Sequence, residues 1–403
     1  MRRYLNCFTN EACILLLMLS SYTATAENID MELGINYQYF PSPSDYLKDD
    51  FRGNAELYVA FEYRDNYLQD LITVNIDGYY NYNQRDNNRT LADFNAFSVS
   101  YFGNNFDLSA GIMTEFWGVT ESKHLVDIIN QTNIADDIDE ETKLGQPMLN
   151  AKLYLDWGSV QVIWMPVFRE RIFSSVDGRV RPALVIDDSL AKFESSDGKN
   201  HNDFAARYSH TLGIWDFGFS YFKGTARNPL LIPETNQENE LVLAPYYEQI
   251  GQAGLDLQMT YEGLLLKVEA IDHDSEIQKN YFATVSGFEY TQVGLFNSSM
   301  DIGYIAEYLY DERGKLATTP FADDVFLGLR LIANNISQTT FLLGSYLDRD
   351  TDSAVWRLEL ETRLQDGLTL TLDGQAFTRQ QPGDMLYDFK NDDYLTLGLQ
   401  WYF

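Results

Sequence analysis

The sequence predicts an all-β protein, a transmembrane antiparallel up-and-down β-barrel. Three observations carry this prediction. Side chains alternate between apolar and polar along many short segments, the connections between these segments alternate between short and long, and the chain ends in an amphipathic segment. In that last segment Leu395, Leu397, Leu399, Trp401 and Phe403 fall on one face, and mostly polar or small residues fall on the other. A side-chain period of two over this length indicates a strand with one apolar face.

Eighteen segments of the chain carry the two-residue alternation. They are residues 31–39, 55–63, 72–76, 97–101, 106–112, 149–155, 160–164, 204–210, 215–221, 255–261, 264–270, 282–290, 300–308, 325–331, 339–345, 354–362, 368–376 and 394–403. A membrane-spanning strand needs about 9–11 residues, and most of these segments can be extended to that length. We therefore expect eighteen strands, with sixteen as the alternative, because the segments near residues 160, 282 and 340 alternate poorly.

The connections between the segments support the same fold. With both chain ends on the periplasmic side, the even-numbered connections lie inside. They are short, and several carry the Gly, Asn or Asp that tight hairpins favour: residues 64–68, 103–104, 157–158, 212–213, 262–263, 293–296, 334–335 and 366–367. The outside connections are mostly longer and more polar: residues 41–53, 83–92, 117–147, 169–201, 225–252, 272–279, 311–322, 348–352 and 379–392. This order is typical of outer-membrane barrels and has no reason to arise in a soluble sandwich.

The first 26 residues read as a secretory signal. Arg2 and Arg3 provide the positive start, residues 12–19 the apolar core, and residues 24–26 a small-x-small cleavage site. The apolar core is too short to span a bilayer as a helix. We expect residues 27–403 to form a single barrel domain in the outer membrane of a Gram-negative bacterium.

Cysteine content and charge narrow the class further. Cys7 and Cys13 are the only cysteines and both lie in the predicted signal, so the exported chain has no disulfide to stabilise it. The chain has 60 acidic and 29 basic residues, for a net charge of −31. That balance argues against nucleic acid as a partner. The 27 Tyr and 25 Phe argue against disorder and suit a barrel with aromatic girdles.

In the clear strands, charged residues lie on the face opposite the apolar row. These predicted lumen-lining residues are Lys152, Asp156, Asp216, Lys267, Glu269, Arg330, Arg357, Glu359, Glu361, Arg363 and Asp373. An Arg or Lys facing lipid at the bilayer midplane would cost about 2–4 kcal/mol, so these side chains belong inside. The sequence thus predicts a hydrated lumen lined by both signs of charge.

One motif lies at the start of the third outside loop. Trp117-Gly118 is followed by Glu121, and the loop then carries Asn130 and Asn133. On these positions the chain resembles a porin-like outer-membrane family without an assigned substrate, in which a strand ends in Trp-Gly, a Glu follows and the third loop holds an Asn-x-x-Asp element. Asn133 replaces the Asp, and the Gly-Arg-Gln that precedes Trp-Gly in that family is absent. General porins and alginate-export barrels are similar in architecture only.

The third and fourth loops supply the candidate pore constriction. The candidates are Glu115, Glu121, Asp136, Asp137, Asp139, Glu140 and Glu141 with Arg169, Arg171, Arg179 and Arg181. Charged side chains at the narrowest point of a pore set its selectivity. The alternative is a third loop that lies over the rim as a lid or packs against a neighbouring subunit. For the arginines three interpretations stay open: pairing with the third-loop acids across the pore, an anion site, or contacts with lipopolysaccharide phosphates or local carboxylates.

Catalytic and metal chemistry find little support. Ser209 and His210 are adjacent on a strand and point to opposite faces, so they form no nucleophile–base pair. No His or Cys spacing is typical of zinc, and Asp348-x-Asp350-x-Asp352 lacks the later Gly and Glu of a calcium loop. We predict no enzyme activity, no metal site and no cofactor.

The sequence therefore predicts a porin-like channel for passive diffusion of small hydrophilic solutes, with a preference for cations. The alternative is a ligand-specific or surface-binding barrel with a closed lumen, and a lipid-modifying enzyme is third. Expected partners are outer-membrane lipid and lipopolysaccharide, with a homotrimer possible. The closing strand, which ends in Phe403, resembles those recognised by the barrel-assembly machinery.

Overall fold

The computed structural model describes residues 28–47, 50–136 and 138–403. The predicted signal and Asp137 lie outside the described residues. Within these ranges no helix is long and apolar enough to cross a membrane. The helical segments are short 3-10 turns: η1 (Asn87–Arg89), η2 (Asp188–Leu190), η3 (Gly198–Asn200), η4 (Leu295–Asn297), η5 (Gly314–Leu316) and η6 (Tyr387–Phe389).

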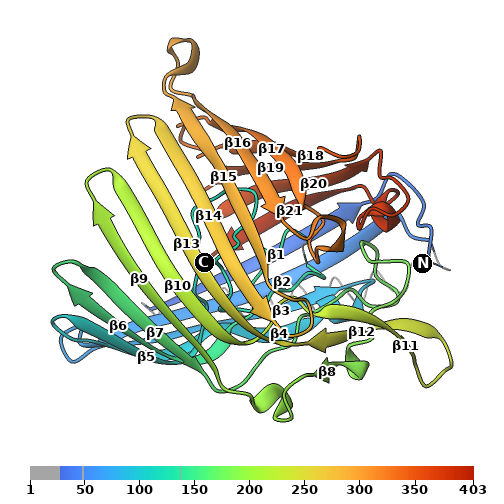
Figure 1. The fold of residues 1–403 in the computed structure, drawn as a ribbon. Coiled ribbons are helices and arrows are strands. Elements are labelled where there is room, and N and C mark those ends of the chain that lie inside the picture. Colours follow the sequence, from blue (N-terminus) through green and yellow to red (C-terminus); the bar gives the residue numbers. More distant parts are fainter. Residues whose placement is uncertain (1–27, 48–49, 137) are drawn as a thin grey trace.

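Eighteen antiparallel strands form one sheet that closes on itself (Figure 1). They are β1 (Ile29–Tyr39), β2 (Gly53–Tyr67), β3 (Ile72–Asn83), β4 (Leu91–Phe102), β5 (Phe106–Met113), β6 (Gln146–Leu155), β7 (Gly158–Met165), β9 (Asp203–Leu212), β10 (Trp215–Thr225), β13 (Gln249–Tyr261), β14 (Leu264–Ser275), β15 (Tyr281–Gln292), β16 (Asp301–Asp311), β17 (Asp323–Ile332), β18 (Thr340–Asp348), β19 (Ala354–Gln365), β20 (Leu368–Thr378) and β21 (Tyr394–Tyr402). Each predicted segment overlaps one of these strands, so the alternative of sixteen strands is wrong.

The barrel closes where the first and last strands pair. β1 and β21 run antiparallel from Glu32 opposite Tyr402 to Tyr39 opposite Leu395. Backbone hydrogen bonds between Met31 and Phe403, 2.9 and 3.3 Å long, complete this seam. Closure leaves no unpaired strand edge, which is the condition for a sheet to cross a membrane.

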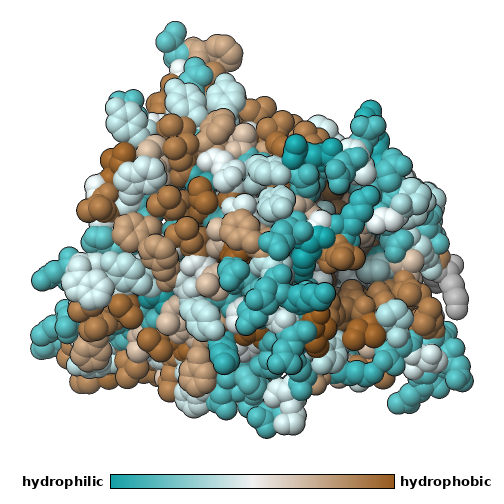
Figure 2. Space-filling model, viewed as in Figure 1, coloured by the Kyte–Doolittle hydropathy of each residue, from teal (hydrophilic) through white to brown (hydrophobic). Residues whose placement is uncertain are grey.

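Apolar and aromatic side chains cover the outside of the barrel (Figure 2). On β21, for example, Leu397 is 49% exposed, because its side chain points away from the lumen. Exposed aromatic residues gather near the end that carries the short turns: Tyr67, Tyr101, Phe102, Phe106, Trp157, Trp215, Tyr261, Tyr290, Tyr402 and Phe403. This is the arrangement of a lipid-facing band with an aromatic girdle.

The outside loops hold a second, smaller sheet that the alternation did not predict. The loop between β10 and β13 folds into the hairpin β11 (Leu230–Thr235) and β12 (Leu241–Tyr247). The two-residue strand β8 (Lys192–Phe193) adds to β12 in parallel. This sheet lies at the end of the barrel opposite the short turns (Figure 1).

The third loop lies within the barrel and packs against its inner wall. It spans residues 114–145, between β5 and β6, and is called the third loop below. Its apolar residues Trp117, Val126 and Ile129 form one buried cluster with Ile250 and Ile271 of the wall. The inner wall is thus apolar where this loop covers it. The apolar sequence of the loop drives this docking, because burial removes its side chains from water.

Candidate pore constriction

Near its start, the third loop has a backbone position that favours glycine. Trp117 is 3% exposed and packs into the buried cluster, and Gly118 follows with φ +150°. A Cβ on Gly118 would lie 3.0 Å from Glu269 Oε1 and 3.0 Å from His124 Nδ1. The Trp-Gly pair therefore anchors the loop and lets its backbone approach the wall closely.

Asn130 holds the two stems of the third loop together. Its Nδ2 donates to the carbonyl oxygens of Met113 and Leu144, each at 2.9 Å, and its Oδ1 accepts from the Glu115 amide at 2.8 Å. The side chain thereby satisfies three backbone groups that have no sheet partner. Asn133 lies farther along the loop, where its backbone N–H donates to the Thr142 carbonyl at 2.8 Å.

Glu269 of β14 fixes the segment that follows Gly118. Its Oε1 accepts from the amides of Val119 and Thr120, at 2.7 and 3.0 Å, and from the Thr120 hydroxyl at 2.7 Å. Its Oε2 accepts from the Val126 amide at 3.2 Å. The Glu269 side chain is fully buried. A buried carboxylate is stable here because charged acceptors make strong hydrogen bonds with several backbone donors.

Glu307 of β16 makes a second, similar anchor next along the loop. It accepts from the amides of Glu121 and Ser122, both at 2.8 Å, and from the Ser122 hydroxyl at 2.6 Å. Tyr346 donates to the Ser122 carbonyl at 2.7 Å, and Arg330 pairs with the Glu121 carboxylate at 2.6 Å. The loop therefore reaches the wall opposite its own strands and is held there by side chains of β14, β16, β17 and β18.

The acidic run of the third loop docks on basic side chains. Asp139 and Glu141 each pair with Arg357 of β19 at 3.0 Å. Glu140 pairs with Lys123 and with Arg171, both at 2.9 Å. Burial opposes ionisation of Glu140, but the two cations outweigh burial and lower the pKa of this carboxyl to about 2.

The Glu140 contacts predict how acid affects the loop. A depressed pKa stabilises the docked state fully above about pH 4.5, the ordinary value, and this contribution is lost as the pH falls through about 2. We expect the protection of the loop amides, measured against the intrinsic exchange rate at each pH, to stay high at pH 5 in the native protein and to fall between pH 4.5 and 2. Glu140→Gln should exchange faster at every pH above that window, with a smaller acid step. Glu238→Gln, on the exposed hairpin, is the matched control; loosening of the native loop between pH 7 and 5 would contradict the assignment.

The four arginines of the fourth loop, residues 166–202, have separate places. Of these four, only Arg171 pairs with an acid among the described residues of the third loop, namely Glu140. Arg169 pairs with Asp93 of β4 at 2.5 Å. Arg179 pairs with Asp392 at 2.7 Å and donates to the carbonyls of residues 42, 51 and 391, so it ties three loops together. Arg181 donates to carbonyls of its own loop. The pairing across the pore thus holds for one arginine of the four.

The remaining predicted residues lie in several places. Glu115 contacts Asn150 of β6, and Asp136 pairs with Arg89 at 3.1 Å. Lys267 pairs with Glu289 at 3.3 Å. The others are on or next to the wall. Lys152 lies over the Tyr154 ring, Asp216 accepts a hydrogen bond from Thr211, and Glu359 contacts Arg357. Arg363 donates to the Ile336 carbonyl, Glu361 stands opposite Thr340, Asp373 lines a lumen cavity, and Asp156 falls in the turn after β6.

The lumen beside β1–β4 is acidic. Two adjoining cavities of about 320 and 160 Å³ lie between these strands and the third loop, and Glu56 and Asp136 line both. Nearer the short turns, Asp30 stands opposite Glu62, and Glu62 stands opposite Asp77. These three carboxylates share the inner face and form no ion pair within the described residues. Like charges placed side by side cost stability, so this row is not explained by folding.

The functional residues missed by the sequence are those that receive the third loop. Glu307 and Tyr346 are far from the loop in sequence and have no motif, and their strands alternate like the others. The acidic row was also missed, because its members belong to three strands whose register had to be known. The available signal was alternation, of Glu62 with Phe61 and Tyr63 and of Asp77 with Ile76. Within the described residues no group of three or more His, Cys, Asp or Glu side chains is placed to hold a metal ion.

These features define an integral outer-membrane β-barrel of eighteen strands with a loop folded into its lumen. Among solved structures it is similar to the Escherichia coli outer-membrane protein Wzi, described as a carbohydrate-binding β-barrel involved in group 1 capsule assembly, with 9% identity, 97% of this chain and 88% of that chain covered, and a TM-score of 0.55. It is similar to Pseudomonas aeruginosa OccK8 (OprE) with 11% identity, 93% and 98% covered, and a TM-score of 0.54. At such identities the likeness is one of fold.

No family model matches the sequence, and no sequence of a curated protein matches it. The expected porin-like architecture is confirmed by the fold. The narrower resemblance that rests on Trp117-Gly118 and Asn130 stays a prediction.

Proposed function

We propose that the barrel is a diffusion channel for small hydrophilic solutes with a preference for cations, and that the third loop forms its constriction. The observation that carries the proposal is the acidic lumen left beside the docked loop. The cavities there are lined by Glu32, Glu56, Asp136 and Asp373 and by one cation, Arg89, which pairs with Glu56 at 2.8 Å and with Asp136 at 3.1 Å. The row of Asp30, Glu62 and Asp77, which has no ion pair among the described residues, continues toward the short turns. Rings of carboxylates select for cations in channels.

The test is the single-channel conductance and reversal potential of the refolded mature chain in a planar bilayer. A salt gradient should give a reversal potential of the sign expected for cation flow, and the selectivity should weaken as salt screens the carboxylates. An anion-selective current would contradict the preference, and a folded barrel without current would contradict the channel itself.

A closed, ligand-binding barrel is the second candidate. The observation in its favour is the docking of the third loop, which occupies part of the lumen and is held against the apolar wall by two carboxylate anchors. Wzi, which shares the fold, is described as a carbohydrate-binding barrel. A barrel that stays closed after the anchors are removed would support this function over diffusion.

We propose the partners on the same footing. The lipid-facing band fits outer-membrane lipid and lipopolysaccharide, and the strand ending in Phe403 fits the barrel-assembly machinery. The fourth-loop arginines do not support lipopolysaccharide binding, because each is already paired within the protein. A homotrimer remains a proposal that the mass of the detergent-solubilised protein tests.

A further inference from the structure

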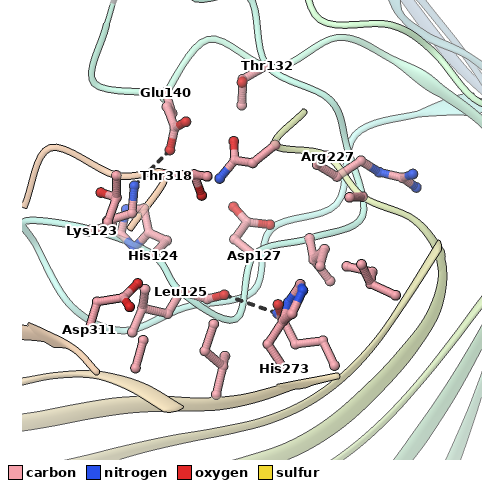
Figure 3. A pocket seen from close by; sticks show the side chains of 18 of the residues that line it. Lys123, His124, Leu125, Asp127, Thr132, Glu140, Arg227, His273, Asp311 and Thr318 are labelled. Atoms are coloured by element: carbon pink, nitrogen blue, oxygen red, sulfur yellow. Dashed lines mark hydrogen bonds and ion pairs between the residues drawn. The ribbon is translucent and has the colours of Figure 1, made fainter. Parts of the chain in front are cut away.

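A second cavity lies on the other side of the third loop, away from the acidic lumen. Its volume is about 530 Å³, within the range of about 300–1,000 Å³ found for small-molecule sites. The third loop forms one wall. The inner faces of β13–β16 form much of the rest, together with Arg171 and with residues 226–228, 278, 313 and 318–319 of the outside loops. Figure 3 shows Lys123, Asp127 and Glu140 from the loop around this space, with His273 and Asp311 from the barrel wall.

The charges around this cavity are already neutralised. Every Lys, Arg, Asp and Glu that lines it belongs to an ion pair, and the pairs are Glu121–Arg330, Lys123–Glu140, Lys143–Asp127, Arg171–Glu140, Arg227–Asp203, Arg313–Asp311, Arg357–Asp139 and Arg357–Glu141. A charged ligand would have to displace one of these partners and leave a charge without compensation, which is costly. The cavity therefore disfavours ions.

Several neutral polar groups around it, by contrast, are unsatisfied, although Asn130, Gln252 and Gln278 on the same lining are hydrogen-bonded. His273 is 4% exposed, and neither of its ring nitrogens has a hydrogen-bond partner among the described residues. Tyr281 stacks on its ring with centroids 4.4 Å apart, which fixes the orientation of the imidazole. Thr132 Oγ1 and Asn228 Oδ1, also on the lining, have no partner in the described chain either. A buried polar group without a partner costs about 1–3 kcal/mol, so each such group calls for an explanation.

An apolar surface completes the lining. Phe116 is 55% exposed although it lies on the inward-folded third loop, and its ring borders the cavity. An aromatic ring offers a flat face to the C–H groups of a ligand, while imidazole, hydroxyl and amide groups each need a partner able to donate or accept. Hydroxyl groups do both.

We propose that this cavity binds an uncharged polyhydroxylated solute, a small neutral carbohydrate, with His273 and Thr132 as hydrogen-bonding residues and Phe116 as the apolar face. The site accounts for the unsatisfied groups and the neutralised charges together. It stands whether or not solutes cross the barrel, because binding is measured without a membrane current.

The test is titration calorimetry of the refolded, detergent-solubilised barrel with glucose, galactose, maltose, sucrose and trehalose, beside the charged analogues glucuronate and glucosamine. At least one neutral sugar should bind, and the charged analogues should bind more weakly. His273→Phe keeps the stacking on Tyr281 and removes both nitrogens, so it should weaken binding by about tenfold or more. Thr132→Val, close in shape, should weaken it as well.

His210→Phe is the matched control, since His210 lies on β9 against Tyr208 and Phe217 and does not line the cavity. It should leave binding unchanged. Circular dichroism and heat-induced gel shift of each variant establish that the barrel is folded. The proposal is overturned if no neutral sugar binds, if the charged analogues bind more tightly, or if folded His273→Phe binds like the native protein.

Discussion

Replacing Glu269 and Glu307 together by Ala is expected to release the third loop and enlarge the current through the barrel. Each carboxylate accepts hydrogen bonds from buried backbone amides of residues 119–126, and Ala accepts none. The loss of two such charged acceptors should weaken the docked state by about 2–4 kcal/mol, allowing for water that solvates the freed amides. Opening of the segment then becomes roughly 30- to 1,000-fold more frequent.

Two measurements check this. Hydrogen exchange should quicken at the amides of Val119, Thr120 and Val126. The single-channel conductance should rise, with more frequent transitions between current levels. Glu361→Ala is the matched control, because Glu361 is also on the wall, opposite Thr340, and forms no ion pair with a described residue of the third loop. Unchanged exchange in the folded double variant would show that the apolar contacts of Trp117 and Val126 hold the loop alone.

Neutralising the acidic row is expected to remove much of the cation preference. The variant is Asp30→Asn, Glu62→Gln and Asp77→Asn. In water each carboxylate is worth about 0.5 kcal/mol to a cation about 8 Å away, and salt at 0.1 M roughly halves that energy. Three such charges correspond to a permeability ratio of about threefold to tenfold, which the variant should lose.

Reversal potentials in a potassium chloride gradient measure that ratio directly. The matched control carries the same change in charge on the exposed loops: Glu238→Gln, Glu240→Gln and Glu276→Gln. Its selectivity should equal that of the native barrel, because those side chains lie outside the lumen. If both variants lose the same share of the permeability ratio, the net charge of the protein sets the selectivity, and the row of Asp30, Glu62 and Asp77 contributes no more than other carboxylates.

The fold was predictable because its signals are local. Alternation marks each strand within a few residues, and the order of short and long connections fixes the topology of a barrel whose neighbours in sequence are neighbours in space. The site was only partly predictable. Glu269 and Arg330 were correctly placed inside from alternation, yet nothing near them in sequence shows that they receive a loop whose residues are more than a hundred positions away.

The fourth-loop arginines also show that long-range contacts could not be predicted from the sequence. Their spacing suggested a cluster, but each satisfies its charge with whatever loop folds next to it, and Arg179 finds Asp392 near the end of the chain. Such pairings depend on how nine outside loops pack, which neither period nor composition encodes. The apolar inner wall was missed because residues such as Ile271 and Phe326 face inward like the charged residues of the same strands.

The pair of β1 and β21, which closes the barrel, differs from every other strand pair in the ring. Every other pair joins two of the eighteen barrel strands that are consecutive along the chain, apart from the loop strands β8, β11 and β12, whereas this pair joins the first strand to the last. Bringing ends so far apart together costs about 3 kcal/mol more than closing a hairpin, by the logarithmic growth of loop entropy. The register between β1 and β21 depends on the registers of all the other strand pairs. A one-residue slip between any two strands would bring an outward residue of β21 opposite an inward residue of β1. Complete pairing of β1 with β21 therefore requires the correct register in every other strand pair of the barrel.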